Sequence, residues 1–203
     1  MPSMTRALAA LCLAAAGLAL PTAHAERADR LQPMNVEADA LRYDDVNQTS
    51  VFTGRVVLTK GTIVIRGARV DVRQDPEGYQ YGVVTAAPGQ RAYFRQKREG
   101  VDEYIEGESE VIEYDGKLDR VKFIRRAEMR RYRGATLSDQ MAGNVITYDN
   151  VSEVFTVDGG PTSPTPGGRV RAVLGPREPA SGAQGATPPA QLRPSTGLSG
   201  DSR

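Results

Sequence analysis

The stretch VFTGRVVLTKGTIVIRGARVDV, residues 51–72, alternates apolar and polar side chains almost without interruption. Within its successive runs the apolar residues lie two positions apart: Val56 and Leu58, Ile63 and Ile65, Val70 and Val72. Because successive side chains of a strand point to opposite faces of a sheet, this period predicts β-strands with one buried face. That face must cover something apolar.

The first 25 residues have the pattern of a secretory signal peptide. Arg6 is followed by an apolar run over residues 8–20, then by Pro21 and the small-x-small triplet that ends at Ala25. The apolar run is too short to span a bilayer core, which disfavours a transmembrane anchor. We therefore expect residues 1–25 to be cleaved and the mature chain to start at Glu26 outside the cytoplasm.

Removal of this segment excludes several kinds of chemistry. The sequence has one Cys and one His, Cys12 and His24, and both lie in residues 1–25. Without them the mature chain has no disulfide, no thiolate or imidazole metal site and no Ser-His-Asp triad. No phosphate-binding Gly-Lys-Ser/Thr loop occurs either. We expect a protein without catalytic residues, metal or cofactor.

Charge balance argues against nucleic acid as a partner. Arg6 is the only charged residue in residues 1–25, so the remainder has 25 basic and 25 acidic residues. A protein that binds the phosphate backbone of nucleic acid normally has an excess of basic residues.

The chain divides into one domain and a tail. Eight of the 13 prolines lie from Pro161 onward, and bulky apolar residues almost cease after Leu174. A segment of this composition buries too little apolar surface to offset the entropy of ordering it. We predict a folded domain over residues 26–175 and a disordered tail over residues 176–203.

Turn-forming residues divide the domain into short segments of alternating pattern. They include Lys60-Gly61, Pro88-Gly89 and Asp115-Gly116, whose residue types favour tight turns. Helical periodicity is almost absent. We expect an all-β domain of antiparallel strands.

A weak repeat runs through the domain. The segments ALRYDD (40–45), VIEYDG (111–116) and VITYDN (145–150) share an apolar residue, Tyr-Asp and a polar turn. Their spacings of 71 and 34 residues correspond to a unit of about 35 residues with a degenerate copy between the first two. Such a period is typical of stacked architectures, in which each unit buries its apolar face on the next.

Charges are also segregated along the chain. Residues 99–119 contain nine acidic residues and one base, whereas residues 120–133 contain seven bases and one acid. On adjacent antiparallel strands these charges would face each other and form a solvated surface. Alternatively, some of the arginines bind ligand phosphates.

Six blocks of sequence resemble one family of proteins. They are QPMNVEADAL (32–41), FTGRVVLTKGTIVIRGARVDVR (52–73), YFRQK (93–97), EGESEVIEYD (106–115), GATLSDQMAGNVITYD (134–149) and GGRVRAVLGP (167–176). Together they resemble the periplasmic lipopolysaccharide transport proteins of the LptA (OstA-like) family. The block at 52–73 is the most specific of them.

The resemblance implies a fold, a ligand and partners. The fold is a twisted, slightly open antiparallel β-jellyroll whose groove receives the acyl chains of lipopolysaccharide. Members stack head to tail into a bridge, with the inner-membrane protein LptC at the N-terminal edge and the outer-membrane protein LptD at the C-terminal edge. Lipid contacts in the family match Met34, Phe94 and Tyr114 in this sequence.

The apolar rows extend this set of candidate residues. The chain has only four Phe and no Trp, so we expect its own side chains to leave the jellyroll interior unfilled and able to hold an apolar ligand. Arg55, Lys60 and Arg66 are expected at the outer face or rim. The predicted lipid-binding residues are Met34, Val36, Leu41, Tyr43, Phe52, Val56, Leu58, Ile63, Ile65, Phe94, Ile112, Tyr114 and Phe123.

The terminal strands are candidates for assembly. PMNVEA (33–38), EVFTV (153–157) and RVRAVL (169–174) have no charge at their apolar positions and no internal Pro, so they lack the features that block edge-to-edge pairing. Pairing of one copy's C-terminal edge with the next copy's N-terminal edge would be open-ended. The predicted interface residues are Met34, Val36, Phe155, Val157, Val170 and Val173.

Two other functions fit parts of the sequence. Glu106, Glu108 and Glu110 project to one face and could serve a carbohydrate-active enzyme, although an exposed acidic run is more often a solvated surface. A structural β-solenoid or adhesin with a filled core is the other alternative, since each apolar residue could be ordinary core.

Overall fold

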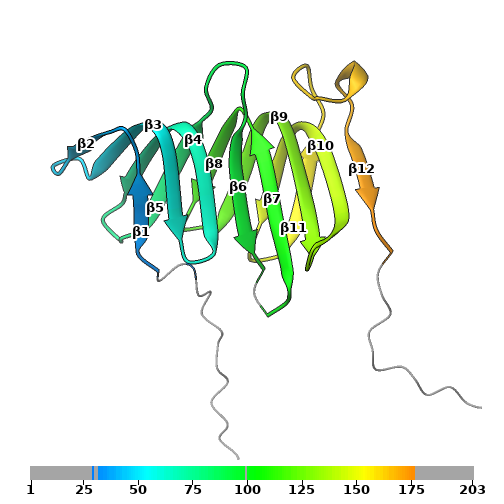
Figure 1. Cartoon of the computed structure of the whole chain (residues 1–203), viewed down its shortest axis with the longest axis horizontal. Helices are drawn as coiled ribbons and strands as arrows, with labels where there is room; N and C mark the ends of the chain where they lie inside the picture. Colours follow the sequence, from blue (N-terminus) through cyan, green and yellow to red (C-terminus); the bar gives the residue numbers. More distant parts are fainter. Residues whose placement is uncertain (1–28, 30–31, 99, 177–203) are drawn as a thin grey trace, which may run out of the picture.

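The computed structural model describes residues 29, 32–98 and 100–176, and its regular structure is almost entirely β-strand (Figure 1). The predicted signal peptide and all but the first residue of the predicted tail lie outside the described residues. The elements are β1 (Met34–Glu37), β2 (Ala40–Asp44), β3 (Thr49–Lys60), β4 (Ile63–Gln74), β5 (Gln80–Thr85), β6 (Ala92–Lys97), β7 (Glu103–Ser109), β8 (Val111–Asp115), β9 (Arg120–Arg133), β10 (Thr136–Asp149), β11 (Val154–Asp158), a short 3-10 helix (Pro166–Gly168) and β12 (Arg171–Leu174).

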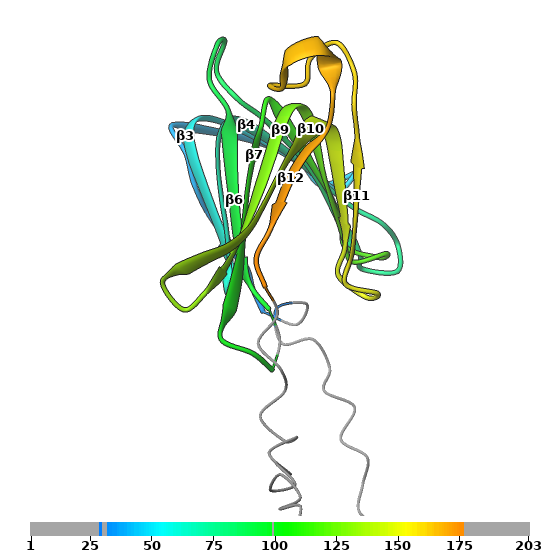
Figure 2. The same cartoon turned by 90° about the vertical axis from the view of Figure 1, so that its right-hand side faces the viewer.

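The strands form two layers that share four long strands. In the front layer the order is β1, β3, β4, β6, β7, β9, β10 and β12; in the back layer it is β2, β3, β4, β5, β8, β9, β10 and β11. Every neighbouring pair is antiparallel. Strands β3, β4, β9 and β10 bend from one layer into the other, and Figure 2 shows the layers diverging from these bends. This arrangement confirms the predicted antiparallel jellyroll.

The bends coincide with bulges in the long strands. In β3 the register slips between Thr53 and Val56, where Gly54 and Arg55 have φ values of 78° and 44°. In β9 both Arg125 and Arg126 have positive φ values, 63° and 50°. A bulge adds residues to one strand and sharpens its bend and twist. The backbone at these positions therefore turns β3 and β9 into the second layer.

The face buried between the layers is the apolar row that the period of the sequence predicted. Val56, Leu58, Ile63 and Ile65 of the quoted stretch are each at most 5% exposed. At the centre, Phe94 of the front layer meets Phe123 of the back layer edge to face, with ring centroids 5.7 Å apart. The contact between these two rings stabilises the packing of the front layer on the back layer.

The repeated Tyr-Asp segments are structurally equivalent. Asp44, Asp115 and Asp149 each end a strand of the back layer and accept hydrogen bonds from backbone N–H groups of the turn that follows. Asp75 caps the turn between β4 and β5 in a related way, in the region of the degenerate copy. The repeat thus corresponds to hairpin turns that satisfy their own backbone donors.

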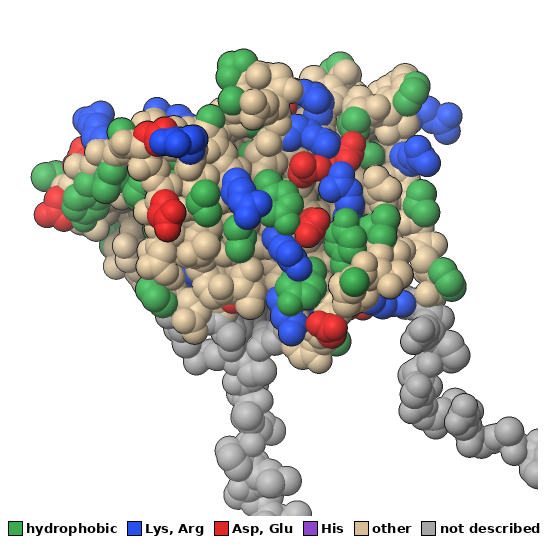
Figure 3. Space-filling view, viewed as in Figure 1, with side chains coloured by type: hydrophobic (Ala, Val, Ile, Leu, Met, Phe, Trp, Pro, Cys, Tyr) green, Lys and Arg blue, Asp and Glu red, His purple; other side chains and the backbone are tan. Residues whose placement is uncertain are grey.

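The charged runs face each other on the outside of the front layer. β7 pairs with β9, and Arg130 Nη2 lies 3.0 Å from Glu108 Oε2, while Arg125 Nε lies 2.9 Å from Glu110 Oε2. Figure 3 shows basic and acidic side chains interspersed over this face. This part of the charge pattern is the solvated surface that the sequence predicted. Among the described residues, no helix is long and apolar enough to cross a membrane.

Candidate functional site: the groove between the layers

The candidate site is the apolar interior between the two layers, which extends from one end of the sheet to the other. At one end β1 and β2 pair only with β3, and at the other end β11 and β12 pair only with β10, within the part of the chain that the structure describes. The layers diverge on the side opposite the bends, here called the open side (Figure 2). The groove is therefore bounded by two unpaired edges and one open side.

Most of the predicted lipid-binding residues meet in the middle of this groove. Val56, Leu58, Ile63, Ile65, Phe94, Ile112 and Phe123 are all buried there, and Met34, Val36, Phe52 and Tyr114 pack against them while partly exposed. The structure thus brings together side chains from β1, β3, β4, β6, β8 and β9. They form one apolar surface with contributions from both layers.

In the apolar core the interior is filled, contrary to the expectation from the sequence. An apolar hollow between the layers, lined by Leu58, Ile65 and Val84 among others, has a volume of about 30 Å³, which is room for a water molecule or two. The large side chains of Phe94, Phe123 and Tyr148 are fully buried and fill most of the space between the layers. Near the bends the layers lie close together, which leaves little further space (Figure 2). An acyl chain can reach the buried residues only if the layers move apart.

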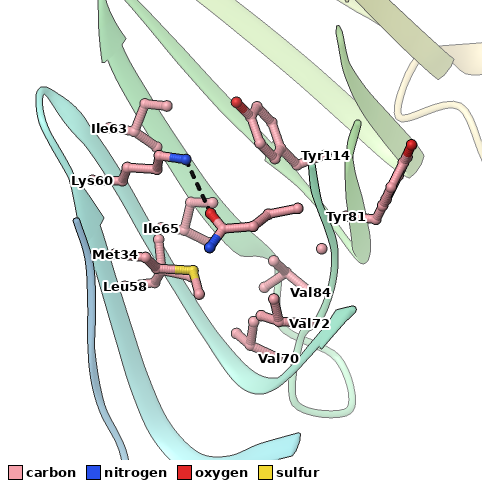
Figure 4. A pocket seen from close by; sticks show the side chains of 12 residues that line it. Met34, Leu58, Lys60, Ile63, Ile65, Val70, Val72, Tyr81, Val84 and Tyr114 are labelled. Carbon is pink, nitrogen blue, oxygen red and sulfur yellow. Dashed lines mark hydrogen bonds between the residues drawn. The ribbon is translucent and has the colours of Figure 1, made fainter. Parts of the chain in front are cut away.

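The hollow lies near the N-terminal edge, between β3 and β4 of the front layer and β5 and β8 of the back layer (Figure 4). Met34, Leu58 and Ile65 line it from the front layer, and Val84 and Tyr114 from the back layer. At its mouth Lys60 Nζ donates a hydrogen bond of 3.0 Å to Gln80 Oε1, which joins the two layers. Lys60 therefore lies at the rim, as expected, whereas Arg55 is on the outside and pairs with Asp39.

Two predicted residues lie on the inner face but outside the core. Leu41 and Tyr43 of β2 are 58% and 57% exposed. They face the interior because Leu41 pairs with Phe52 and Tyr43 with Ser50 of β3, yet no strand of the described chain covers them. These side chains extend the apolar row to the N-terminal edge.

The C-terminal edge has a matching apolar row. The rings of Phe155 and Tyr148 stack with centroids 4.3 Å apart, and Val157 packs on the same core while partly exposed. Val170 and Val173 are exposed, but Val173 of β12 pairs with Gln140, which faces away from the groove, so Val173 lies on the outer face and not in this row. Figure 1 shows these strands at the end of the molecule opposite β1 and β2.

Toward the open side, the inner face of the front layer becomes polar. The inward rows continue from Phe94 to Gln96 and Arg98 beyond β6, and from Met129 to Arg131 and Arg133 in β9. Asp139 of β10 is 3% exposed and pairs with Arg131. The charge pattern of residues 120–133 is compatible with a solvated surface or with phosphate binding, and the alternation with Met129 places Arg131 and Arg133 on the inner face.

Within this polar rim, Glu103 accepts hydrogen bonds from two arginines. Glu103 accepts hydrogen bonds from Arg98 and, at 3.0 Å, from Arg133 Nε. Burial raises the pKa of the Glu103 carboxyl, but these two arginines more than offset it and hold the pKa below its usual value. Glu103 is therefore an anion that keeps both guanidinium groups in place.

The three glutamates considered for catalysis are ion-paired. Glu106 lies 3.7 Å from Arg95 Nε, Glu108 pairs with Arg91 and Arg130, and Glu110 pairs with Arg125. Within the described residues no group of three or more His, Cys, Asp or Glu side chains could hold a metal ion. What the groove offers chemically is an apolar interior with a charged rim.

Comparison with known proteins agrees with this geometry. Residues 35–154 match the family described as LptA/(LptD N-terminal domain) LPS transport protein. The chain is 31% identical over 165 residues to the lipopolysaccharide export system protein LptH of Pseudomonas aeruginosa, covering 79% of this chain and 86% of the relative. It is 28% identical over 168 residues to the lipopolysaccharide export system protein LptA of Haemophilus influenzae, covering 83% and 91%.

A solved structure has the same fold. The crystal structure of LptH from Pseudomonas aeruginosa, the LptA-homologous periplasmic component of the lipopolysaccharide transport device, superposes with a TM-score of 0.63 at 27% identity. The match covers 73% of this chain and 99% of that structure. With its fold, its groove and these relatives, the chain belongs to the family of LptA and LptD N-terminal-domain lipopolysaccharide transport proteins.

Proposed function

We propose that this chain is a periplasmic bridge protein that binds lipopolysaccharide through the acyl chains of its lipid A and passes it toward the outer membrane. The observation that supports this most directly is the apolar row between the layers, which runs from Met34 and Leu41 at one unpaired edge to Phe155 and Val157 at the other. A row that ends at free edges can continue into a second molecule. A closed core would have no such continuation.

Acyl chains fit the groove by their chemistry. Burial of each CH2 group contributes about 0.8 kcal/mol, so a chain of about a dozen carbons contributes on the order of 10 kcal/mol before the cost of opening the layers and of binding. The proposed contacts are the predicted lipid-binding residues, with Phe94 and Tyr114 at the centre. Separation of the layers would expose the front and back halves of this apolar surface to the ligand.

The two edges would serve different partners. In this proposal LptC pairs with β1 and β2, LptD pairs with β11 and β12, and copies of the chain join head to tail by the same edges. Strand addition satisfies unpaired backbone groups, and the apolar side chains at each edge give register. Export by the predicted signal peptide would place the chain in the periplasm, with residues 26–175 as the lipid-binding domain and residues 176–203 as a tail.

A structural β-module without a ligand is the second candidate. The small hollow and the almost complete burial of Phe94, Phe123 and Ile112 favour it. It differs from the bridge in one respect that can be measured: its interior never contacts a lipid.

Photo-crosslinking tests the two functions against each other. A photoreactive amino acid at Phe94 or Tyr114 should capture lipopolysaccharide, while the same amino acid at Val83, which is exposed on the outer face of β5, should not. Capture at Val83 alone, or at none of the three positions, contradicts lipid transport through the groove. Native mass spectrometry of the complex then identifies the adduct by the mass of lipid A.

A further inference from the structure

The rim of the groove contains an ion pair that crosses from one layer to the other. Arg98 follows β6 in the front layer, and Glu153 precedes β11 in the back layer; the guanidinium of Arg98 pairs with the carboxylate of Glu153. The contact spans the open side, next to a hollow of about 430 Å³ with a mixed polar and apolar lining, which Thr62, Gln96 and Asn150 also line. It closes the groove where an amphipathic ligand would enter between the layers.

Three arginines of the rim, Arg98, Arg131 and Arg133, point inward and differ in their ion-pair partners. Arg131 pairs with the buried Asp139, and Arg133 pairs with Glu103; both contacts lie within the front layer. Arg98 is shared between Glu103 of its own layer and Glu153 of the other. Its second partner therefore leaves whenever the layers separate, whereas the partners of Arg131 and Arg133 stay.

Arg98 and Glu153 also differ in burial. The side chain of Arg98 is 13% exposed, whereas that of Glu153 is 54% exposed. Arg98 Nε is buried and has no hydrogen-bond partner among the described residues, so the guanidinium has one unsatisfied N–H donor. A buried donor without an acceptor is costly, and a ligand anion that reaches it gains a charge-assisted hydrogen bond.

We propose that Arg98 binds a phosphate group of the lipid ligand and that Glu153 competes with this phosphate for the guanidinium. The inference rests on the proposed function and adds to it the recognition of the headgroup. Lipid A has phosphate groups on the sugars to which its acyl chains are attached. Along such a lipid the apolar acyl chains are followed by the charged phosphates. The inner row that starts in β6 likewise changes from apolar Phe94 through Gln96 to charged Arg98.

Exchange of Glu153 for phosphate has two consequences. The guanidinium keeps two anionic partners, Glu103 and the ligand, so its burial stays compensated. The back layer meanwhile loses a contact that holds it to the front layer. Headgroup binding and separation of the layers thus become favourable together.

Two lipids and four proteins test the proposal. The lipids are bisphosphorylated lipid A and the same molecule with its phosphates removed; the proteins are the wild type, Arg98→Gln, Glu153→Gln and Arg125→Gln. The last is a matched control because Arg125 pairs with Glu110 outside the groove. Equilibrium binding of each lipid is measured by displacement of a fluorescent fatty acid.

The expected result is selective. Arg98→Gln should weaken binding of the phosphorylated lipid by about tenfold, as expected for loss of a charge-assisted hydrogen bond, and leave binding of the dephosphorylated lipid unchanged. Glu153→Gln should bind the phosphorylated lipid several-fold more tightly than the wild type. Arg125→Gln should behave as the wild type with both lipids.

Other outcomes overturn the proposal in ways that can be told apart. Equal weakening of both lipids by Arg98→Gln means that Arg98 only supports the fold, and no weakening means that phosphate binds elsewhere. If Arg98→Gln does not fold, a Glu153→Gln variant without tighter binding of the phosphorylated lipid refutes the competition. A wild type that binds neither lipid refutes the proposed function itself.

Discussion

Lys60 and Gln80 join the front and back layers at the mouth of the apolar hollow, where the ammonium of Lys60 donates to the amide oxygen of Gln80 at 3.0 Å. Lys60 ends β3 of the front layer and Gln80 begins β5 of the back layer. The dashed line from Lys60 in Figure 4 marks their hydrogen bond. The hollow beneath them is too small for an acyl chain. Lipid binding in this groove therefore requires movement of one layer relative to the other.

A covalent link between these positions should prevent that movement. The only Cys of the sequence lies in the predicted signal peptide, so Lys60→Cys with Gln80→Cys gives a unique pair of thiols. After reaction with a short bismaleimide, we expect lipopolysaccharide binding to fall at least tenfold, because the layers can no longer separate. Binding is measured before and after reaction on the same sample.

The control places the same linker within one layer. Glu113 and Lys122 pair across β8 and β9, and both are exposed on the outer face. Linking Glu113→Cys to Lys122→Cys should leave lipid binding unchanged. Unchanged binding in the Lys60–Gln80 link as well would show that the ligand does not enter between the layers.

Gly107 is the position where the core has the least room. A Cβ atom at residue 107 would lie 2.1 Å from Cε1 of Phe123, so Gly107→Ala must displace the ring that contacts Phe94. We expect a loss of about 1–3 kcal/mol in the free energy of unfolding, as for other overpacked cores. The measurement is urea unfolding followed by circular dichroism.

Gly82→Ala is the matched control for this change. Gly82 also faces the interior, but a Cβ there would make only an ordinary contact of 3.9 Å with Tyr114. The alanine reduces the entropy of the unfolded chain, so its effect should be neutral or slightly stabilising. A destabilisation equal to that of Gly107→Ala would mean that space in the interior is not the cause.

Charges at the two edges should stop assembly in a complementary way. Val36→Asp places a charge in the apolar row of β1, and Val173→Asp places one on β12. We expect the wild type to form chains in analytical ultracentrifugation and each variant alone to remain monomeric at the same concentration, because each variant lacks one competent edge. Val83→Asp, in the middle of β5, should form chains as the wild type does.

A mixture of the two edge variants makes the prediction stricter. The intact C-terminal edge of Val36→Asp can pair with the intact N-terminal edge of Val173→Asp, so an equimolar mixture should give dimers and nothing longer. Dimers of either variant alone would indicate an isologous contact and refute head-to-tail pairing.

Acid should weaken the hairpin turn between β10 and β11. The backbone N–H of Ser152 and then the guanidinium of Arg120 donate to Asp149 and lower its pKa from 3.8 to about 2. Because the folded pKa is the lower one, the stabilisation is complete above about pH 4 and is lost as the pH falls toward 2. Asp149→Asn removes this titration, so its urea midpoint should change less between pH 4 and pH 2 than that of the wild type.

The exposed Asp158 provides the comparison for this experiment. Asp158→Asn changes the same charge on the same hairpin, without the hydrogen bonds of the turn. The difference in acid dependence between the two variants therefore isolates the hydrogen bonds of the turn from the loss of one negative charge. If Asp149→Asn and the wild type lose stability in parallel between pH 4 and pH 2, the turn does not contribute to the acid sensitivity.

Some features of the fold were predictable because they depend on neighbours along the chain. The period of two in residues 51–72 identified which side chains would be buried, and the Tyr-Asp segments marked hairpin turns in which Asp44, Asp115 and Asp149 cap their own backbone. Both follow from local backbone geometry. The same period places Arg131 inward beside Met129, whereas the charge pattern alone left a solvated surface and phosphate binding both open.

Other features depend on residues that only the tertiary structure brings together. The width of the groove is set by the contact of Phe94 with Phe123, which lie in different layers, and it leaves a hollow rather than an open channel. The pairing of Arg98 with Glu153 likewise depends on how closely the two layers approach. The sequence by itself thus determined strands, turns and the family resemblance, because these follow from local periodicity and motif. Closure of the groove was decided by packing across the layers, because the distance between distant segments is a property of the whole core.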